Sequence, residues 1–135
     1  MKWAMWLGLF TVALLGVWAW VRLAPSDATR WHVMPSQVAD TDMPSGAMRV
    51  VAADLAQLDT VIRATPRTVV LAGSVESGMI TYVTRSKVVG FPDYTTVRRN
   101  GEKIEIYGRL RFGKSDLGVN ATRVDGWLEA LRQRG

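Results

Sequence analysis

Residues 109–123 carry the densest set of chemically active side chains in the sequence: four cations, one carboxylate and one amide, with two glycines among them. The run reads Arg-Leu-Arg-Phe-Gly-Lys-Ser-Asp-Leu-Gly-Val-Asn-Ala-Thr-Arg. Guanidinium groups, a lysine and the free N–H groups at a helix start can converge on one anion. The run therefore predicts a strand-to-helix junction able to bind a phosphate, a lipid headgroup or a carboxylate.

A structural use of the same residues is the favoured interpretation, and anion binding is the alternative to it. Asp93, which follows Phe91 and Pro92, can reach this group if its loop returns to the same end of the sheet. The aspartates then neutralise arginines, Ser115 or Asp116 caps the next helix, and the glycines permit a tight junction. The predicted anion site or ion network consists of Asp93, Arg109, Arg111, Lys114, Ser115, Asp116, Asn120 and Arg123.

A hydrolase is the catalytic alternative, with Ser115 as nucleophile beside Asp116 and with Lys114 as the base. His32 is the only histidine, lies far away in the sequence, and there is no cysteine, so no metal site is predicted. The letters Gly-x-x-x-x-Gly-Lys-Ser, which begin at Gly108, match a phosphate-binding loop. Alternating residues there predict a strand instead, so the match is attributed to chance and no catalytic residue is assigned.

The last predicted strand, residues 103–112, positions the first two arginines, and strict alternation gives it two different faces. Its apolar face consists of Ile104, Ile106, Leu110 and Phe112, and its polar face of Lys103, Glu105, Tyr107, Arg109 and Arg111. An amphipathic helix follows the glycines. Its apolar stripe consists of Leu117, Ala121, Val124, Leu128 and Leu131, flanked by Trp127.

The preceding elements complete a small α+β domain. Residues 47–64 predict an amphipathic helix on the spacing of Val51, Leu55, Leu58 and Ile62. Residues 68–75, 79–86 and 94–99 are strand-like, and Asn100-Gly101 favours a tight hairpin turn. The sequence therefore predicts an α+β fold: a four-stranded antiparallel sheet with two helices packed on one face.

An apolar segment precedes this domain. Residues 3–21 contain no charged side chain, and at about 1.5 Å per residue such a helix crosses most of a hydrocarbon core of about 30 Å. Tryptophans favour both water–lipid interfaces, and here they are Trp3, Trp6, Trp18 and Trp20. A single-pass membrane anchor is predicted; a secretory signal cleaved near residues 17–19 is the alternative.

The predicted order is a transmembrane anchor at 1–23, a linker at 24–46 and the α+β domain at 47–135. The linker is rich in Pro, Ser, Asp and Thr. It also contains the bulky run 31–34, so it is expected to lie against the domain or the membrane surface. A short N-terminal arm before an apolar stretch usually stays in the cytoplasm. The C-terminal domain is therefore expected in the periplasm, anchored in a bacterial inner membrane.

The charge distribution bears on the partners. Lys and Arg exceed Asp and Glu by 17 to 12, and the surplus is spread over the C-terminal half instead of forming a block. A dispersed excess gives only weak support for nucleic-acid binding, and a charged surface near anionic lipid explains it as well. The predicted partners are the lipid bilayer and either an anionic lipid or a larger membrane protein complex, with no nucleic acid.

Three stretches resemble the bacterial and plastid family known as domain of unknown function (DUF) 1499. They are Tyr82-Val-Thr-Arg-Ser, Gly90-Phe-Pro-Asp and the run 109–123, and the resemblance covers residues 67–131. The family's Ser-Arg-Ser-Arg-Val-Gly-like stretch appears here as Gly108-Arg-Leu-Arg-Phe-Gly, without the two serines. The resemblance implies an exported or membrane-tethered α+β domain with no established activity and no cofactor.

The functional hypothesis is a membrane-anchored, non-catalytic accessory or binding module that presents a basic sheet end to a partner protein or an anionic headgroup. A hydrolase-type enzyme is one alternative. The other is a single-span subunit whose helix docks beside a larger membrane complex, where Gly8 and Gly16 would allow close approach.

Overall fold

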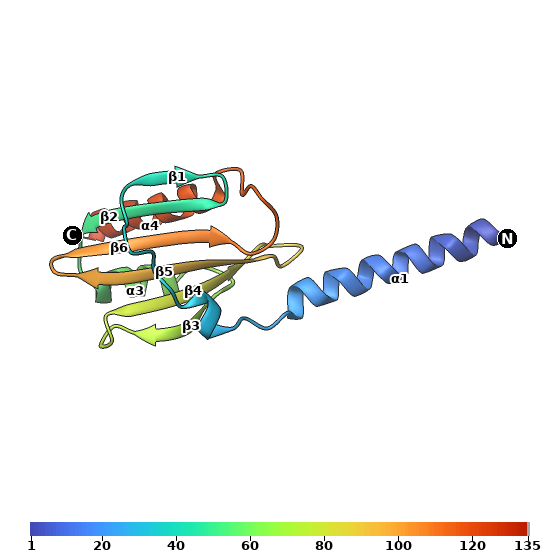
Figure 1. The fold of residues 1–135 in the computed structure, drawn as a ribbon, viewed down its shortest axis with the longest axis horizontal. Coiled ribbons are helices and arrows are strands. Elements are labelled where there is room, and N and C mark those ends of the chain that lie inside the picture. Colours follow the sequence, from blue (N-terminus) through green and yellow to red (C-terminus); the bar gives the residue numbers. More distant parts are fainter. Residues whose placement is uncertain (135) are drawn as a thin grey trace.

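The computed structural model describes residues 1–134 of the 135-residue chain. Helix α1 (Lys2–Leu23) projects from one end of a domain built around one sheet (Figure 1). The other helices are α2 (Ala28–Trp31), α3 (Leu55–Arg63) and α4 (Val119–Arg134). The strands are β1 (Thr41–Met43), β2 (Gly46–Ala52), β3 (Thr68–Ser74), β4 (Met79–Arg85), β5 (Pro92–Asn100) and β6 (Lys103–Leu110).

The sheet has six strands in the order β1-β2-β6-β5-β4-β3, and each neighbouring pair is antiparallel. The prediction of four strands is wrong because it assigned most of β2 to a helix and β1 to the linker. The spacing of Val51 from the next apolar residues fits a helix, but Val51 lies in β2 and pairs with Ile104 of β6. The helix begins only after Asp54, whose carboxylate accepts a hydrogen bond from the Gln57 amide (3.3 Å).

Helices α3 and α4 pack together on one face of the sheet, as predicted (Figure 1). Trp127 also enters the core, where its indole nitrogen donates to the Thr65 hydroxyl (2.7 Å). Leu117 lies before α4 and is 92% exposed, contrary to its predicted place in the apolar stripe. The helices contribute Leu55, Leu58, Ile62, Val124, Leu128 and Leu131 to the core, and the strands contribute Ile80, Tyr82, Val97, Ile104 and Ile106.

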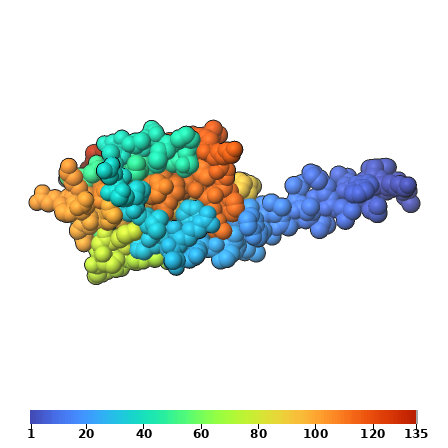
Figure 2. Space-filling view, viewed as in Figure 1, coloured from blue at the N-terminus to red at the C-terminus, as the bar shows by residue number. Residues whose placement is uncertain are grey.

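The opposite face of the sheet is partly covered by residues 24–34, here called the strap. The strap includes α2, and the chain that follows it runs across the strands to β1 (Figures 1 and 2). Trp31 stacks on Tyr94 with ring centroids 4.0 Å apart, and Ser26 shares a 2.8 Å hydrogen bond with the Tyr94 hydroxyl. The segment predicted as a linker thus contains a helix and a strand and packs on the domain.

Helix α1 is the one helix among residues 1–134 that is long and apolar enough to cross a membrane, a test that an N-terminal signal sequence also passes. Its 22 residues extend about 33 Å at about 1.5 Å per residue. Val21 is its one buried residue, and the apolar surface of the helix is otherwise exposed. The helix therefore contacts the domain only through its C-terminal turn.

Candidate functional site

The sheet divides the eight predicted site residues between its two faces. Side chains alternate along β5 and β6, so Asp93 lies on the helix face while Arg109 and Arg111 lie on the strap face. The loop after β6 carries Lys114 and Ser115, and both are exposed. The structure brings together Asp93, Asp116, Asn120 and Arg123 on the helix face.

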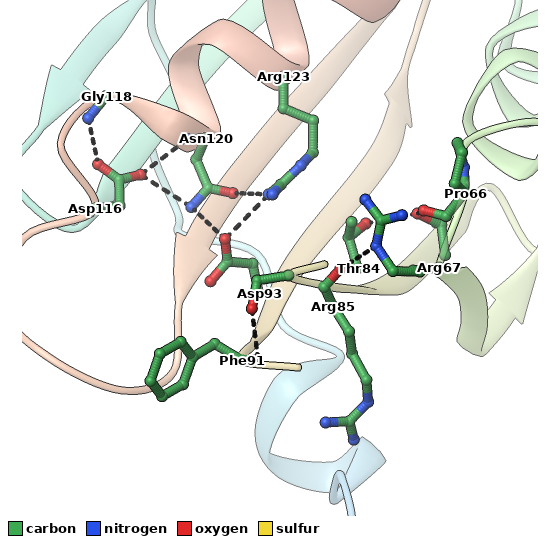
Figure 3. A network of polar contacts seen from close by, with 12 residues as sticks. Pro66, Arg67, Thr84, Arg85, Phe91, Asp93, Asp116, Gly118, Asn120 and Arg123 are labelled. Carbon is green, nitrogen blue, oxygen red and sulfur yellow. Dashed lines mark hydrogen bonds and ion pairs between the residues drawn. The ribbon is translucent and has the colours of Figure 1, made fainter. Parts of the chain in front are cut away.

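On the helix face these four residues form one network of hydrogen bonds and an ion pair (Figure 3). Asp93 Oδ2 accepts from Arg123 Nη1 (3.1 Å) and from Asn120 Nδ2 (3.3 Å). Asp116 Oδ2 accepts from the Asn120 amide (3.0 Å) and from Asn120 Nδ2 (2.9 Å). Arg123 Nη1 also donates to Asn120 Oδ1 (2.9 Å). The network joins the start of α4 to the start of β5.

Asn120 is fully buried at the centre of this network and packs against a glycine of β6. A Cβ on Gly108 would lie 3.2 Å from Asn120 Oδ1, so the close approach of α4 to the strand favours glycine there. This position is the first glycine of the phosphate-loop pattern. Its surroundings are a strand and a helix and not a loop that wraps a phosphate.

The two carboxylates of the network have opposite pKa shifts. Burial raises the pKa of Asp93, and the neighbouring Arg123 opposes that rise. Burial also acts to raise the pKa of Asp116, but hydrogen bonds from Asn120 and from the Gly118 amide outweigh it and lower the pKa. The network contains two carboxylates, Asp93 and Asp116, and one guanidinium, that of Arg123, a set of charges that is unfavourable for binding an anion.

A cavity of about 260 Å³ opens beside this network. Its walls come from the loops 86–91 and 111–118 and from the start of α4. Three charged residues line it, namely Asp93, Asp116 and Arg123. A ligand here would therefore meet an ion pair that already serves the fold.

Among the described residues, Ser115 is not paired with a base, as the hydrolase hypothesis requires. Its hydroxyl accepts a hydrogen bond from the Leu117 amide (3.3 Å), and no carboxylate, lysine or histidine within residues 1–134 bonds to it. Both oxygens of Asp116 are bonded to α4 and the preceding turn. His32 lies on the opposite face, where its Nδ1 is 2.8 Å from the Thr81 hydroxyl.

On the strap face, Arg109 is a buried cation held by neutral oxygen atoms. It donates to the Thr96 hydroxyl (2.8 Å), to Tyr107 O (3.0 Å) and to Trp31 O in the strap. Burial lowers its pKa to about 10. Arg111 similarly donates to Pro25 O (2.9 Å) and to the Tyr94 hydroxyl (3.1 Å). These two arginines fasten the strap to the sheet.

Three further arginines, which were not among the predicted site residues, meet where α1 joins the domain. Arg85 Nη1 donates to Val21 O (3.1 Å) and Gly90 O (2.9 Å), and its Nη2 donates to Ala24 O (3.3 Å). Figure 3 shows its side chain pointing away from the Asp93 network. Arg22, Arg67 and Arg85 line a second cavity, of about 350 Å³. Arg85 belongs to the stretch that resembles the family, which was the available signal for this site.

Five arginines at this end of the domain share one property. Each donates to backbone carbonyl or hydroxyl oxygens, and none lies within 4.0 Å of a carboxylate in the described part of the chain. Their positive charge is therefore not neutralised locally, in contrast to that of Arg123. We call them the carbonyl-bound arginines: Arg22, Arg67, Arg85, Arg109 and Arg111.

Apolar side chains are exposed on the loops at the same end of the sheet. Val88 is 75% exposed and Leu117 is 92% exposed, and Phe91 and Val119 are also exposed. The loops that carry them project from the end of the sheet at which α1 arrives (Figure 1). This end of the domain thus combines unneutralised cations with apolar tips.

Comparison with known proteins identifies a family without assigning an activity. Residues 23–131 match the family described as "Protein of unknown function (DUF1499)", which confirms the predicted resemblance. No curated protein and no solved structure matches the chain.

Proposed function

Because the chain belongs to the DUF1499 family, whose function is unknown, we propose a function from its own geometry. The protein is a single-pass, membrane-anchored, non-catalytic binding module that holds the end of its sheet against an anionic bilayer surface. The observation that carries this proposal is the fixed junction between α1 and the domain.

The junction is built from contacts that hold α1 in a set orientation. A helix leaves its last carbonyl groups without partners, and Arg85 satisfies Val21 O together with Ala24 O. Trp20 packs edge-on against Phe112, with ring centroids 5.4 Å apart. Arg22 Nη1 donates to Val88 O (3.1 Å), which links the helix to the 86–91 loop. The loops at this end are therefore held beside the end of the span.

A helix of this length places its C-terminal turn at the water–lipid interface when its apolar residues fill the hydrocarbon core. The exposed Val88 and Leu117 then lie at the depth of the headgroups. Lys87 and Lys114 are exposed on the same two loops. Apolar tips flanked by cations are the combination by which peripheral segments bind anionic membranes. The unneutralised charge of the carbonyl-bound arginines adds to that attraction.

Fluorophores attached to single cysteines test this proposal, and the cysteine-free chain makes such labelling selective. The variants are Val88→Cys and Leu117→Cys, with Glu102→Cys in the distant β5–β6 turn as the matched control. In vesicles containing phosphatidylglycerol, we expect the first two labels to be blue-shifted and quenched by a lipid-borne quencher near the headgroups. The label at position 102 should remain in water. Equal exposure of all three labels to aqueous iodide would refute the proposal.

We also propose that the domain lies on the periplasmic side of a bacterial inner membrane. The support is the short arm that contains Lys2 before the apolar segment, an arrangement shared with export signals. The Glu102→Cys variant reports the side directly, because a membrane-impermeant maleimide labels intact cells only if the domain is outside the cytoplasm. Labelling that requires cell lysis would place the domain in the cytoplasm.

A further inference from the structure

The cavity beside the end of α1 combines three cationic side chains from distant parts of the chain. Arg22 comes from the last turn of α1, Arg67 from the turn before β3, and Arg85 from the end of β4. The other lining residues are Leu23, Val69, Val83, Ser86 and Gly90, so no acidic residue among positions 1–134 lines the cavity. Its volume of about 350 Å³ falls in the range of sites that bind small ligands, roughly 300–1,000 Å³.

Backbone geometry fixes two of these arginines in place. Arg67 has a φ of 56°, in the left-handed region that residues other than glycine seldom adopt. Its backbone carbonyl accepts from the Arg85 amide (2.9 Å), and its Nε donates to Arg85 O (3.0 Å) (Figure 3). Gly90 has a φ of 82°, and a Cβ there would lie 3.1 Å from Arg22 Cγ. The loop backbone therefore packs closely against the side chain of Arg22.

The three guanidinium groups have different free capacity for a ligand. Arg85 uses both terminal nitrogens to bind carbonyl groups, so its role is to hold the junction. Arg67 uses only Nε and Arg22 uses only Nη1 in hydrogen bonds within residues 1–134. A guanidinium has five N–H donors, so both arginines keep donors for an oxyanion.

We propose that Arg22 and Arg67 bind the phosphate group of one anionic phospholipid, with Arg85 positioning the cavity. This inference rests on the proposed function, because the membrane supplies the ligand at this depth. Leu23 and Val69, both exposed at the cavity, offer apolar contact to the glycerol and the first methylene groups. The cavity on the helix face is unsuited to the same ligand, because Asp93 and Asp116 line it.

Native mass spectrometry of the full chain, released from nanodiscs of phosphatidylglycerol and phosphatidylcholine, tests the inference. We expect one phosphatidylglycerol molecule to be retained in preference to phosphatidylcholine. The double variant Arg22→Gln with Arg67→Gln should reduce that retention by about tenfold or more, since it removes charge-assisted hydrogen bonds. A matched double variant removes two exposed arginines elsewhere, Arg99→Gln with Arg134→Gln, and should retain the lipid as the parent does.

Three results would overturn the inference. They are unchanged retention of phosphatidylglycerol in the Gln double variant of the cavity, a loss of retention in the matched variant as large as in the cavity variant, and release of the bound phosphatidylglycerol by millimolar inorganic phosphate. The last result would identify a free phosphate as the ligand. The variant Arg22→Lys with Arg67→Lys keeps both positive charges, so it should retain more lipid than the Gln double variant does. This comparison distinguishes an effect of lost charge from an effect of misfolding. The labels at positions 88 and 117 report surface contact independently. If these labels contact the membrane but the protein shows no preference for phosphatidylglycerol, the cavity is not a lipid site, while the proposed function still holds.

Discussion

Arginines on the two faces of one sheet end differ in what holds them. On the helix face, Arg123 is paired with Asp93 at 3.1 Å, and both side chains are largely buried. On the strap face and at the junction, the carbonyl-bound arginines donate to neutral oxygens. An ion pair cancels its own field, whereas a guanidinium bonded to a carbonyl keeps its full charge.

Arginines with different partners therefore have different roles in this domain. The helix-face network uses its charges to join α4 to β5, and its cavity contains two carboxylates. The carbonyl-bound arginines fasten the strap and the end of α1 to the sheet, and no carboxylate of the described residues neutralises their charge.

Breaking the helix-face network at its centre should produce the largest effect. Asn120→Ala removes the side-chain hydrogen bonds to Asp93, Asp116 and Arg123 and leaves a small void at a fully buried position, although each carboxylate keeps at least one other donor. We expect the free energy of unfolding to fall by about 3 kcal/mol. Denaturant unfolding of the full chain in detergent, followed by tryptophan fluorescence, measures it. Gln133→Ala removes an exposed amide from the same helix and should change stability by less than about 0.5 kcal/mol. Equal effects would show that the network does not stabilise the fold.

A smaller effect should separate the two kinds of arginine. Arg123→Met leaves the Asp93 carboxylate buried without its cation, whereas Arg109→Met leaves only neutral oxygens behind. An unpaired buried charge costs more than an unpaired carbonyl. We expect Arg123→Met to be the more destabilising variant at pH 7.5 by about 1–2 kcal/mol. The comparison fails if the order is reversed.

The difference in unfolding free energy between Arg123→Met and Arg109→Met should depend on pH, because the pKa of Asp93 is raised in the folded state. A carboxyl group with a raised folded pKa binds its proton more tightly when folded, so stability falls as the pH rises from the unfolded value, about 3.9, through the folded value. Loss of Arg123 raises that pKa further. The penalty of Arg123→Met should therefore shrink at about pH 4.5, where Asp93 is more protonated, while that of Arg109→Met stays constant.

The membership of the site was predictable only in part. Alternation along residues 103–112 correctly placed Arg109 and Arg111 on the polar face. The side of the sheet reached by Asp93 could not be deduced in the same way, because that depends on the register between β5 and β6. Arg85 was missed as a site residue because its partners, Val21 O and Ala24 O, lie more than 60 positions away.

The fold shows the same limit of local patterns. The stripe of Leu55, Leu58 and Ile62 correctly predicted α3, because its spacing is set by helix geometry. Val51 fits the same spacing but lies in β2, since the open edge of β6 offers it a full ladder of hydrogen bonds. Long-range pairing thus overrode a local preference. The strand β1 is only three residues long and has no period that a sequence pattern could reveal.

Salt provides the mildest test of the contrast between the two faces. Raising the ionic strength from about 0.1 M to about 1 M shortens the screening length from about 10 Å to about 3 Å. Exposed Arg22 and Arg67 should be screened, so retention of phosphatidylglycerol by the full chain should fall several-fold over this range. The Arg123–Asp93 pair is largely buried and in direct contact, so the free energy of unfolding should change by only about a few tenths of a kcal/mol. If stability and lipid retention fell in parallel, both sets of charges would share one environment, and the distinction between carboxylate-paired and carbonyl-bound arginines would lose its functional meaning.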